Sequence, residues 1–407
     1  MDTIDKLWLL GSNPSVVADK DACSSGCGVP QTRPSRNRPL PGIYRAAVPG
    51  RGRVPILRVL MTNVCQFDCR YCAVNCNRDV QRTAFQPEEL VKLFLEMHRR
   101  GSADGLFLSS GVAGDPGKIE ARMLETVAIL RERENFRGYI HLKIMPGLPL
   151  NYIEWAAGLV DRLSINLEAP TPEHLARIAP KKAAATNAVA AMETVRRIKD
   201  SLPRLLSAGQ STQLVVGAAG ESDKEILERC RWLYGHLKMR RVYYSAYQPV
   251  CGEELAPPAP PAREHRLYQS DWLLRLYPIP LDELLFDDYD NLPLAADPKL
   301  VWALRNPEKF PKEVNRATYR ELLQVPGIGP LSARRIVDAR RSYKFRDLSA
   351  LQVMGVVTKR ARHFLLLDGR YLGGRSVMAS QILHLPDESE PYQASLWDPT
   401  EETVISA

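Results

Sequence analysis

The chain has 407 residues, of which 45% are hydrophobic and 25% are charged, and its formal net charge at pH 7 is +8. This composition is ordinary for a soluble globular protein and suffices for one large core and a smaller appended domain. No apolar run approaches the length of a bilayer-spanning helix, and the first ten residues lack the basic start and long apolar stretch of a secretory signal. On these grounds we expect a cytoplasmic protein with no membrane partner.

The charge is unevenly distributed along the chain. Residues 376–407 contain six acidic residues and no Lys or Arg, so the rest of the chain carries a net charge of +14. So basic a body favours a polyanion as partner, and a well-solvated basic surface is the alternative explanation.

Residues 1–54 are predicted to form an irregular N-terminal arm. Residues 11–53 are rich in Gly, Pro, Ser and Arg and show no clear periodicity. The arm contains Cys23 and Cys27, either beside a metal centre or as plain loop residues.

Residues 55–252 alternate between strand and helix patterns. We predict strands at 57–63, 105–110, 138–146, 162–169, 211–218 and 241–250. Between them we predict helices at 87–100, 118–132, 151–159, 188–200 and 223–238. Six such repeats predict an α/β fold with a parallel sheet and crossover helices.

A cysteine-rich loop directly follows the first predicted strand. Cys65, Cys69 and Cys72 have the spacing Cys-x3-Cys-x2-Cys, with Tyr71 before the third. Thiolates are the usual ligands of iron–sulfur clusters, and three can hold a [4Fe–4S] cube with one iron left open. An open position is typical of a catalytic metal site. Because Cys76 extends the series, a closed electron-transfer cluster or a zinc site is the alternative.

Polar residues in the later strands fall on one parity. They are His141 and Lys143 in the third predicted strand, and Ser164, Asn166 and Glu168 in the fourth. Period-two polarity predicts that one side of each strand faces a ligand-filled interior, which favours a partial barrel over an open doubly wound sheet. A few satisfied core polar residues are the alternative.

The cysteine spacing, its aromatic residue and the six repeats resemble the radical S-adenosylmethionine (SAM) superfamily. The resemblance implies a partial (β/α)6 barrel of TIM type, with SAM bound to the open iron. Reduction would cleave SAM to methionine and a 5′-deoxyadenosyl radical that abstracts a hydrogen atom. It also implies an electron donor such as flavodoxin or ferredoxin. The SAM-binding residues it implies are Tyr71, Ser109, Ser110, Gly111, Ser164, Asn166, Glu168, Gly217 and Tyr244. Ser109-Ser110-Gly111 departs from the superfamily's Gly-Gly-Glu motif, so backbone carbonyls would have to serve there.

Three residues are candidates for chemistry on the substrate. His141 and Lys143 are candidates for substrate contact or proton transfer. Cys251, near the end of the sixth predicted strand, is a candidate hydrogen-atom donor to a substrate radical. Structural lumen residues and a plain buried thiol are the alternatives.

After the barrel we expect a Pro-rich and helical connector over residues 253–314, with a helix at 263–277. From about residue 296 only short helices are predicted. Pro326-Gly327-Ile328-Gly329-Pro330 lies between helical patterns at 319–323 and 331–341. A degenerate copy follows, with helices at 348–353 and 358–367 around Gly355. Residues 371–407 form an acidic tail.

This repeated pattern resembles a tandem helix-hairpin-helix domain, residues 315–370, a module that binds the DNA backbone without reading sequence. The residues expected to contact phosphates are Gly327, Ile328, Gly329, Arg334, Arg335, Gly355 and Lys359. A protein-interaction use of the module is the alternative.

The whole combination resembles a family of radical SAM proteins described as DNA modification or repair enzymes and associated with a uracil-DNA-glycosylase-like partner. Segments at 21–25, 106–111, 139–141 and 216–221 carry this resemblance together with the hairpins. The leading hypothesis is a radical SAM enzyme that acts on DNA. The alternatives are an enzyme that modifies tRNA or rRNA, and a non-catalytic DNA-binding protein with a structural or redox-sensing cluster.

Overall fold

The structure is a computed structural model that describes residues 1–11, 40–48, 52–250 and 255–373. The described chain forms two compact units. The first contains the residues up to Glu221 together with Trp232–Ala259, and the second contains Ser222–Arg231 together with 260–373. Cys23, Cys27, Cys251 and the acidic tail beyond residue 373 lie outside the described residues.

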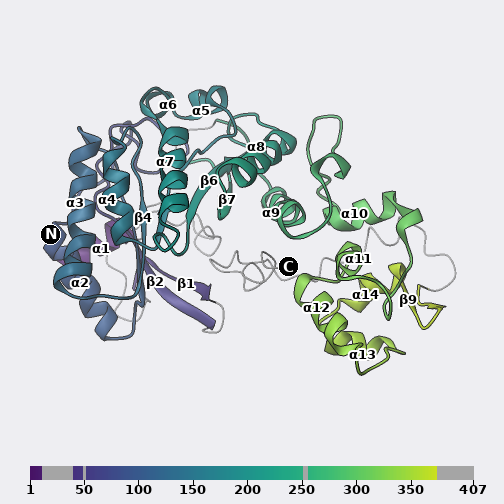
Figure 1. Cartoon of the computed structure of the whole chain (residues 1–407). Helices are drawn as coiled ribbons and strands as arrows, with labels where there is room; N and C mark the ends of the chain where they lie inside the picture. The colour runs from purple at the N-terminus through teal and green to yellow at the C-terminus, as the bar shows by residue number, and fades with distance from the viewer. Residues whose placement is uncertain (12–39, 49–51, 251–254, 374–407) are drawn as a thin grey trace. The chain divides into compact units, whose positions relative to one another are not determined.

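A seven-stranded sheet organises the first unit (Figure 1). Its strands lie in chain order, with β1 antiparallel to β2 and all later neighbours parallel. They are β1 Ile43–Val48, β2 Gly52–Leu60, β3 Gly105–Ser109, β4 Tyr139–Lys143, β5 Arg162–Ser164, β6 Gln210–Val216 and β7 Arg241–Ala246. Because β1 and β7 are its two edges, the sheet is an open, partial barrel. The six predicted parallel strands are confirmed.

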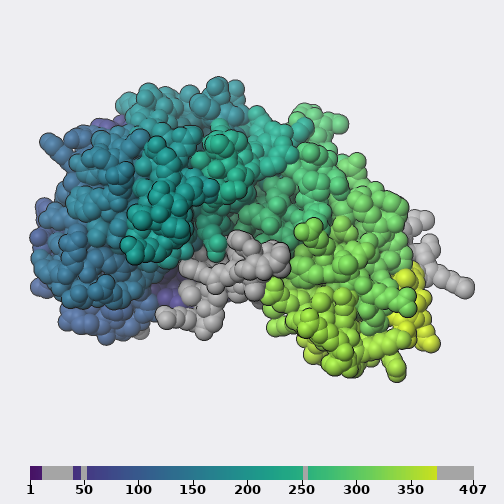
Figure 2. Space-filling model, in the orientation of Figure 1, coloured from purple at the N-terminus to yellow at the C-terminus, as the bar shows by residue number. Residues whose placement is uncertain are grey.

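Helices cross over between the parallel strands and cover the outer face of the sheet. Five lie within a few residues of their predicted ranges: α2 Pro87–Arg99, α3 Pro116–Ala128, α4 Asn151–Leu159, α7 Ala188–Ser201 and α8 Asp223–His236. Two short helices between β5 and β6, α5 Pro172–Ile178 and α6 Pro180–Ala185, were not predicted. In Figure 1, α3, α4 and α7 lie in front of the sheet, and the space-filling view of this face shows the helices hiding most of the strands (Figure 2).

Alternate residues of the sheet face opposite sides. One set is apolar and fully buried, and includes Leu57, Val59, Leu106, Leu108, Ile140, Leu142 and Leu163. Strand register aligns the other set in two rows: Arg58, Phe107, His141 and Arg162, and then, nearer the carboxyl ends, Lys143, Ser164, Ser211 and Arg241. We call the face that carries both rows the lumen. The polar residues of the lumen include those whose alternation in the sequence predicted a barrel.

The prediction of an irregular N-terminal arm is wrong for its described parts. Residues Thr3–Gly11 form helix α1, whose Leu7 and Leu10 are fully buried. Lys6 Nζ forms an ion pair with Glu89 Oε2 of α2 at 2.6 Å. β1 adds an antiparallel edge strand. The short apolar patch of α1 therefore belongs to the core, where tertiary packing stabilises a helix too short to be stable alone.

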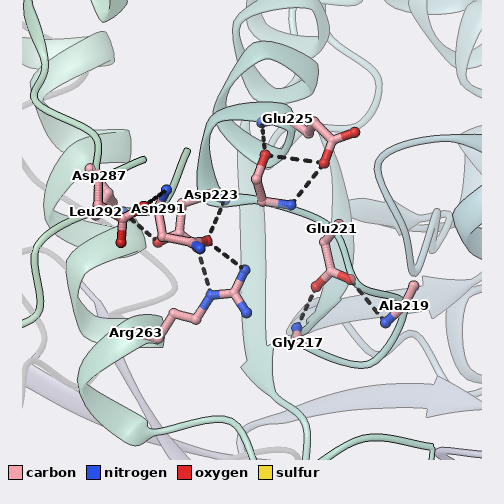
Figure 3. Close-up of polar contacts among 10 residues, drawn as sticks. Gly217, Ala219, Glu221, Asp223, Glu225, Arg263, Asp287, Asn291 and Leu292 are labelled. Atoms are coloured by element: carbon pink, nitrogen blue, oxygen red, sulfur yellow. Dashed lines mark hydrogen bonds and ion pairs between the residues drawn. The ribbon is translucent and has the colours of Figure 1, made fainter. Parts of the chain in front are cut away.

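The second unit is mainly helical. Its helices are α9 Pro261–Leu276, α10 Pro298–Arg305, α11 Tyr319–Gln324, α12 Pro330–Ala339, α13 Leu348–Val353 and α14 Thr358–Ala361. The Asp223 carboxylate accepts hydrogen bonds from Arg263 Nε at 2.7 Å and from the Leu292 amide at 2.9 Å (Figure 3). This buried network joins three segments that are far apart in the sequence.

Two predictions for the second unit are wrong. A three-stranded sheet, β8 Lys312–Glu313, β9 Leu365–Leu367 and β10 Arg370–Tyr371, is present where only helices were expected. The helix predicted at 358–367 ends at Ala361, and a 3-10 turn at Arg362–Phe364 leads into β9. The apolar run 364–367 fits either a helix or a strand by its pattern, and pairing with β8 decides for the strand.

Candidate functional site

The cluster loop, residues 64–76, leaves β2 at the carboxyl end of the sheet. Cys69 is 8% exposed, and Cys65 and Cys72 are half-buried. The Cys72 amide donates to the Cys69 carbonyl at 2.9 Å, and the Cys76 amide donates to the Phe67 carbonyl at 2.9 Å. These turns hold the three predicted ligands in one compact loop.

Arg82 fixes the shape of this loop from the inside. Its guanidinium donates to four backbone carbonyls between 2.5 and 2.8 Å away, those of Asn63, Val74, Asn75 and Arg78. A planar guanidinium has five N–H donors in a fixed arrangement, so it can satisfy several carbonyls of an irregular loop at once. The cluster loop is therefore held in one conformation by a side chain outside the cysteine motif.

Cys76 has different neighbours from Cys69. Its thiol lies 3.6 Å from Lys181 Nζ and 3.4 Å from Asn77 Oδ1. Cys69 lies beside Tyr71, Lys182 and Glu168. Substitution of Cys76 tests the four-thiolate alternative directly.

A buried ion pair stands beside the loop. Lys182 Nζ of α6 lies 2.7 Å from Glu168 Oε1, and the two side chains are 7% and 6% exposed. Burial alone would raise the pKa of Glu168, but the ammonium groups of Lys182 and Lys143 hold it below its usual value. Glu168 has a φ of 65°, in the left-handed region, so the backbone departs from the extended course of β5 there.

The same charges act on the thiol of Cys69. Burial raises the pKa of Cys69 to about 12, and the nearby Lys182 opposes this rise. The thiol is therefore protonated in the protein without a metal at pH 7. Iron binds thiolate rather than thiol, so cluster assembly has to release this proton.

Two buried hydroxyl groups at this end of the sheet lack protein partners. Among the described residues, the side-chain oxygens of Ser110 and Ser164 make no hydrogen bond. A buried hydroxyl without a partner costs about 1–3 kcal/mol. A ligand with an amine, a carboxylate and hydroxyl groups, such as SAM, fits these positions because it can satisfy them.

Gly111 is required by close packing against the cluster loop. A Cβ atom at this position would lie 2.4 Å from the Val64 carbonyl oxygen. The Gly111 amide donates to the Thr62 carbonyl at 2.7 Å, and the neighbouring Ser109 carbonyl accepts from Met61. The Ser-Ser-Gly segment thus places its backbone directly against the strand that leads to the cysteines.

The turn after β6 is shaped by Glu221. Its carboxylate accepts the amide of Gly217, with a φ of 87°, and the amide of Ala219 at 2.9 Å (Figure 3). Gly220 also has a positive φ, of 78°. Positive φ favours glycine, so the two glycines allow a tight turn whose backbone a flat ring can approach.

The other predicted site residues take up distinct positions. Asn166 lies beside Glu168. Tyr244 is 3% exposed and pairs with Leu214 on the parity that faces the helices, so only its backbone is available to the lumen. His141 stacks on Phe107 with ring centroids 3.9 Å apart.

Both candidate proton carriers lie on the lumen face. Burial, with the charges of Arg162, Lys143 and Arg58, lowers the pKa of His141 well below its usual value, so its ring is neutral at pH 7. Burial also lowers the pKa of Lys143, and the Glu168 carboxylate opposes this. The thiols of Cys69 and Cys72 also act on Lys143, so Lys143 lies close to the cluster loop. His141 lies two residues earlier on β4, farther from the carboxyl end of the sheet.

The first unit is also similar to known proteins. The model of the radical SAM superfamily matches residues 59–233, from β2 to α8. These residues form a radical SAM domain. A radical SAM domain is an enzyme domain whose cofactors are a [4Fe–4S] cluster and SAM. When bound, these cofactors supply the electron and the 5′-deoxyadenosyl radical that takes a hydrogen atom from the substrate.

The chain's own residues have supporting roles in this chemistry. Cys65, Cys69 and Cys72 would hold the cluster. Among the described residues, no three His, Cys, Asp or Glu side chains gather as they would around a single metal ion. A cube requires a different arrangement, because each thiolate binds a different iron. Tyr71 and Ser164 offer hydrogen bonds to SAM, and the helix-covered sheet limits the access of water.

Some solved structures are similar to about half of this chain. They include the [FeFe]-hydrogenase maturase HydG, with 12% identity over 53% of this chain and 48% of that one, and a TM-score of 0.42. HydG from Carboxydothermus hydrogenoformans has 16% identity, 53% and 50% coverage and a TM-score of 0.43. Methylornithine synthase (PylB) has 14% identity, 53% and 60% coverage and a TM-score of 0.40. The chain spans about half the length of the two maturases.

No curated protein matches the sequence. Within the described residues, every helix is too short or too polar to cross a membrane.

Three residues of the site were missed by the sequence analysis. Arg82 and Lys182 lie outside any motif, so no local signal marks them. Glu221 is the last residue of the segment 216–221. Its place directly after Gly217-Ala218-Ala219-Gly220 would have suggested a carboxylate that accepts hydrogen bonds from the amides of the turn.

The second unit contains two similar helical hairpins. Gly327 joins α11 to α12 with a φ of 83°, and Gly355 joins α13 to α14 with a φ of 85°. Ile328 is 1% exposed and its carbonyl accepts Lys299 Nζ at 2.6 Å. Gly329 has a φ of −97° and is the N-cap residue of α12.

Each hairpin packs against the second helix of the other. The Gly327 carbonyl accepts the Val357 amide at 2.9 Å, and the Gly355 carbonyl accepts Ser332 Oγ at 2.8 Å. A Cβ atom at Gly327 would lie 2.5 Å from the Val357 carbonyl oxygen. The two hairpins are therefore joined by reciprocal contacts.

The predicted basic residues lie on the surface of this body. Arg334 and Arg335 of α12 and Lys359 of α14 are exposed. Residues 315–370 contain twelve Lys or Arg and four Asp or Glu, a net charge of +8. Twelve cations on so small a body produce a strongly positive surface.

Proposed function

We propose that this radical SAM enzyme acts on DNA, and that the paired hairpins of the second unit are a tandem helix-hairpin-helix domain that holds DNA by its phosphates. The observation that carries the proposal is that the Gly327 and Gly355 turns share a positive φ and that each packs against the second helix of the other hairpin. Repetition of one motif in one body is typical of a module that follows a regular polymer backbone.

The chemistry of the hairpin surface supports a phosphate partner. Helix α12 begins at Pro330, so the first amides after it point out of the helix end without helical partners. Arg334 and Arg335 add two exposed cations one turn later. Contacts of this kind position a protein on a duplex and do not read its sequence.

The reaction requires that a nucleotide leave the stack. Hydrogen abstraction needs the target atom close to the bound SAM, beneath the cluster loop of the first unit. An unpaired nucleotide, or one flipped out of the duplex, meets this need at a cost of a few kcal/mol. We therefore expect damaged, mismatched or single-stranded sites to react best.

The test is a reaction of the full chain with its cluster reconstituted without oxygen. The protein is reduced with SAM and either DNA or tRNA, and the nucleosides are analysed by mass spectrometry. The proposal predicts a SAM-dependent new nucleoside or deoxynucleoside fragment from DNA. A product from tRNA alone would overturn the DNA proposal in favour of an RNA substrate.

A pair of matched variants tests the role of the hairpins. The double variant Arg334→Ala/Arg335→Ala is expected to bind DNA at least tenfold more weakly, with the salt dependence reduced by about two contacts. The control, Arg99→Ala/Arg100→Ala, removes two adjacent exposed arginines at the end of α2. Equal losses in both variants would contradict a specific role of the hairpins.

A further inference from the structure

The lumen carries more positive than negative charge. Arg162 and Lys143 lie on adjacent strands at positions that face inward, and Arg58 and Arg241 belong to the same two rows. Arg162 is only 2% exposed. The carboxylate that these rows approach, Glu168, already forms an ion pair with Lys182.

The charge of Arg162 has no acidic partner among the described residues. Its Nη1 donates to the Tyr243 hydroxyl at 3.2 Å, and its Nε atom, although buried, makes no hydrogen bond. Leaving a buried cation unpaired costs several kcal/mol. A bound anion would remove this cost and would use the free side of the guanidinium.

Further buried polar groups face the same space. His141 is 3% exposed and neither of its ring nitrogens has a hydrogen-bond partner in the described chain. Ser211 is 1% exposed and Ser164 is 5% exposed, and both hydroxyls also lack partners. Because His141 pairs with Arg162, and Ser164 with Ser211, these groups lie on neighbouring strands about 5 Å apart.

We propose that the lumen is a binding site for the phosphate of the nucleotide on which the enzyme acts, an assignment that rests on the proposed function. A guanidinium matches an oxyanion with two parallel hydrogen bonds. Phosphate fits better than carboxylate, because its oxygens can accept the donors of Arg162, Lys143, His141 and both serines together. The target nucleotide would then enter the lumen with its phosphate toward Arg162, and its sugar or base toward the bound SAM.

The test compares ligands that differ only in the phosphate. The full chain, loaded with its cluster and SAM, is titrated with thymidine 5′-monophosphate, thymidine and inorganic phosphate. We expect the monophosphate to bind at least tenfold more tightly than thymidine, and inorganic phosphate to compete with it. Equal affinity for the monophosphate and thymidine would overturn the proposal.

Variants identify the site. Arg162→Met is expected to weaken monophosphate binding at least tenfold and thymidine binding less than twofold, with Arg162→Lys in between. Ser211→Ala removes one oxygen, so it should fold normally and weaken monophosphate binding about threefold. The control Arg133→Met, an exposed residue, should change nothing. If Arg162→Met and Ser211→Ala leave monophosphate affinity unchanged, the site is not in the lumen.

The outcome separates this inference from the proposed function. Monophosphate binding that depends on Arg162, in an enzyme that alters no nucleic acid, would keep the lumen site for a free phosphate ester and overturn action on DNA. DNA modification by an enzyme that binds the monophosphate no better than thymidine would keep the proposed function and overturn the lumen site.

Discussion

At the scale of single residues, the ion pair of Lys182 and Glu168 governs the electrostatics beside Cys69. Both side chains are almost fully buried. Removing one member of such a pair leaves an uncompensated charge, whereas replacing both with apolar groups restores most of the stability. The pair also lies next to the Cys69 thiol. It therefore affects both the stability of the fold and the protonation of a predicted cluster ligand.

Lys182→Met should therefore lower the free energy of unfolding by about 3–5 kcal/mol. The double variant Lys182→Met/Glu168→Leu should regain most of that stability but not the affinity for SAM, because Glu168 and its neighbours face the ligand. Denaturant unfolding and SAM titration measure the two effects. A single variant as stable as the wild type would show that the pair is not buried as described.

The buried Lys299 should make the stability of the fold depend on pH. Burial lowers the pKa of Lys299 to about 7, whereas an unfolded chain keeps it near its usual value of about 10.4. Between these values the unfolded state binds one more proton, so stability rises with pH by up to about 1.4 kcal/mol per unit. Below pH 7 both states are protonated and the dependence ends.

The comparison of wild type with Lys299→Met isolates this effect. From pH 7 to pH 9, the wild type should gain about 2 kcal/mol relative to the variant in urea unfolding. A difference that stays constant across this range would mean that Lys299 is charged in the folded protein. The Ile328 carbonyl, which accepts its Nζ, lies in the first hairpin, so the same titration should be visible in that turn.

At the scale of elements, the cluster loop depends on Arg82. Arg82→Ala removes the donor of four carbonyl hydrogen bonds, and Arg82→Lys offers one ammonium in place of a planar fork. We expect both variants to incorporate less than half of the wild-type iron and sulfide. Full incorporation by Arg82→Ala would show that the cysteines order the loop unaided.

Most elements of the first unit could be predicted, and the exceptions have physical reasons. The six parallel strands are apolar on one parity, which sequence patterns show well. The strand predicted at 162–169 is regular only over Arg162–Ser164, and Glu168, with a φ of 65°, then forms an isolated parallel bridge with Leu214. Helix α6, which supplies Lys182, follows another short helix and has no distinctive pattern.

The candidate site was predictable in the same uneven way. The role of the cysteines could be inferred from their spacing, and those of Gly111 and Gly217 were implied by the family resemblance. Arg82 and the free side of Arg162 depend on contacts between distant segments, which no local pattern encodes. Tyr244 was implied by the family resemblance, and only the register showed that its side chain faces the helices.

At the scale of the whole molecule, charge distinguishes the proposed DNA-binding body from the rest. Residues 315–370 carry a net charge of +8 in a chain whose total is also +8. The affinity of a phosphate-binding protein falls linearly on a double logarithmic plot against salt, with a slope of about −0.9 for each contact. We expect a slope between about −4 and −8 for duplex DNA, and little dependence on sequence.

Fluorescence anisotropy from 50 to 200 mM salt measures this slope. At each salt concentration, two DNA duplexes of unrelated sequence should bind with affinities that agree within a factor of about three. A slope near zero, or a strong preference for one sequence, would rule out phosphate contacts as the main source of affinity.

The most direct test of the account is electron paramagnetic resonance of the reduced, oxygen-free protein with and without SAM. The account predicts a [4Fe–4S] signal that shifts on addition of SAM, persists in Cys76→Ser and disappears in Cys69→Ser and Cys72→Ser, with 5′-deoxyadenosine as product. A signal indifferent to SAM that is lost in Cys76→Ser, or zinc in place of iron, would contradict it.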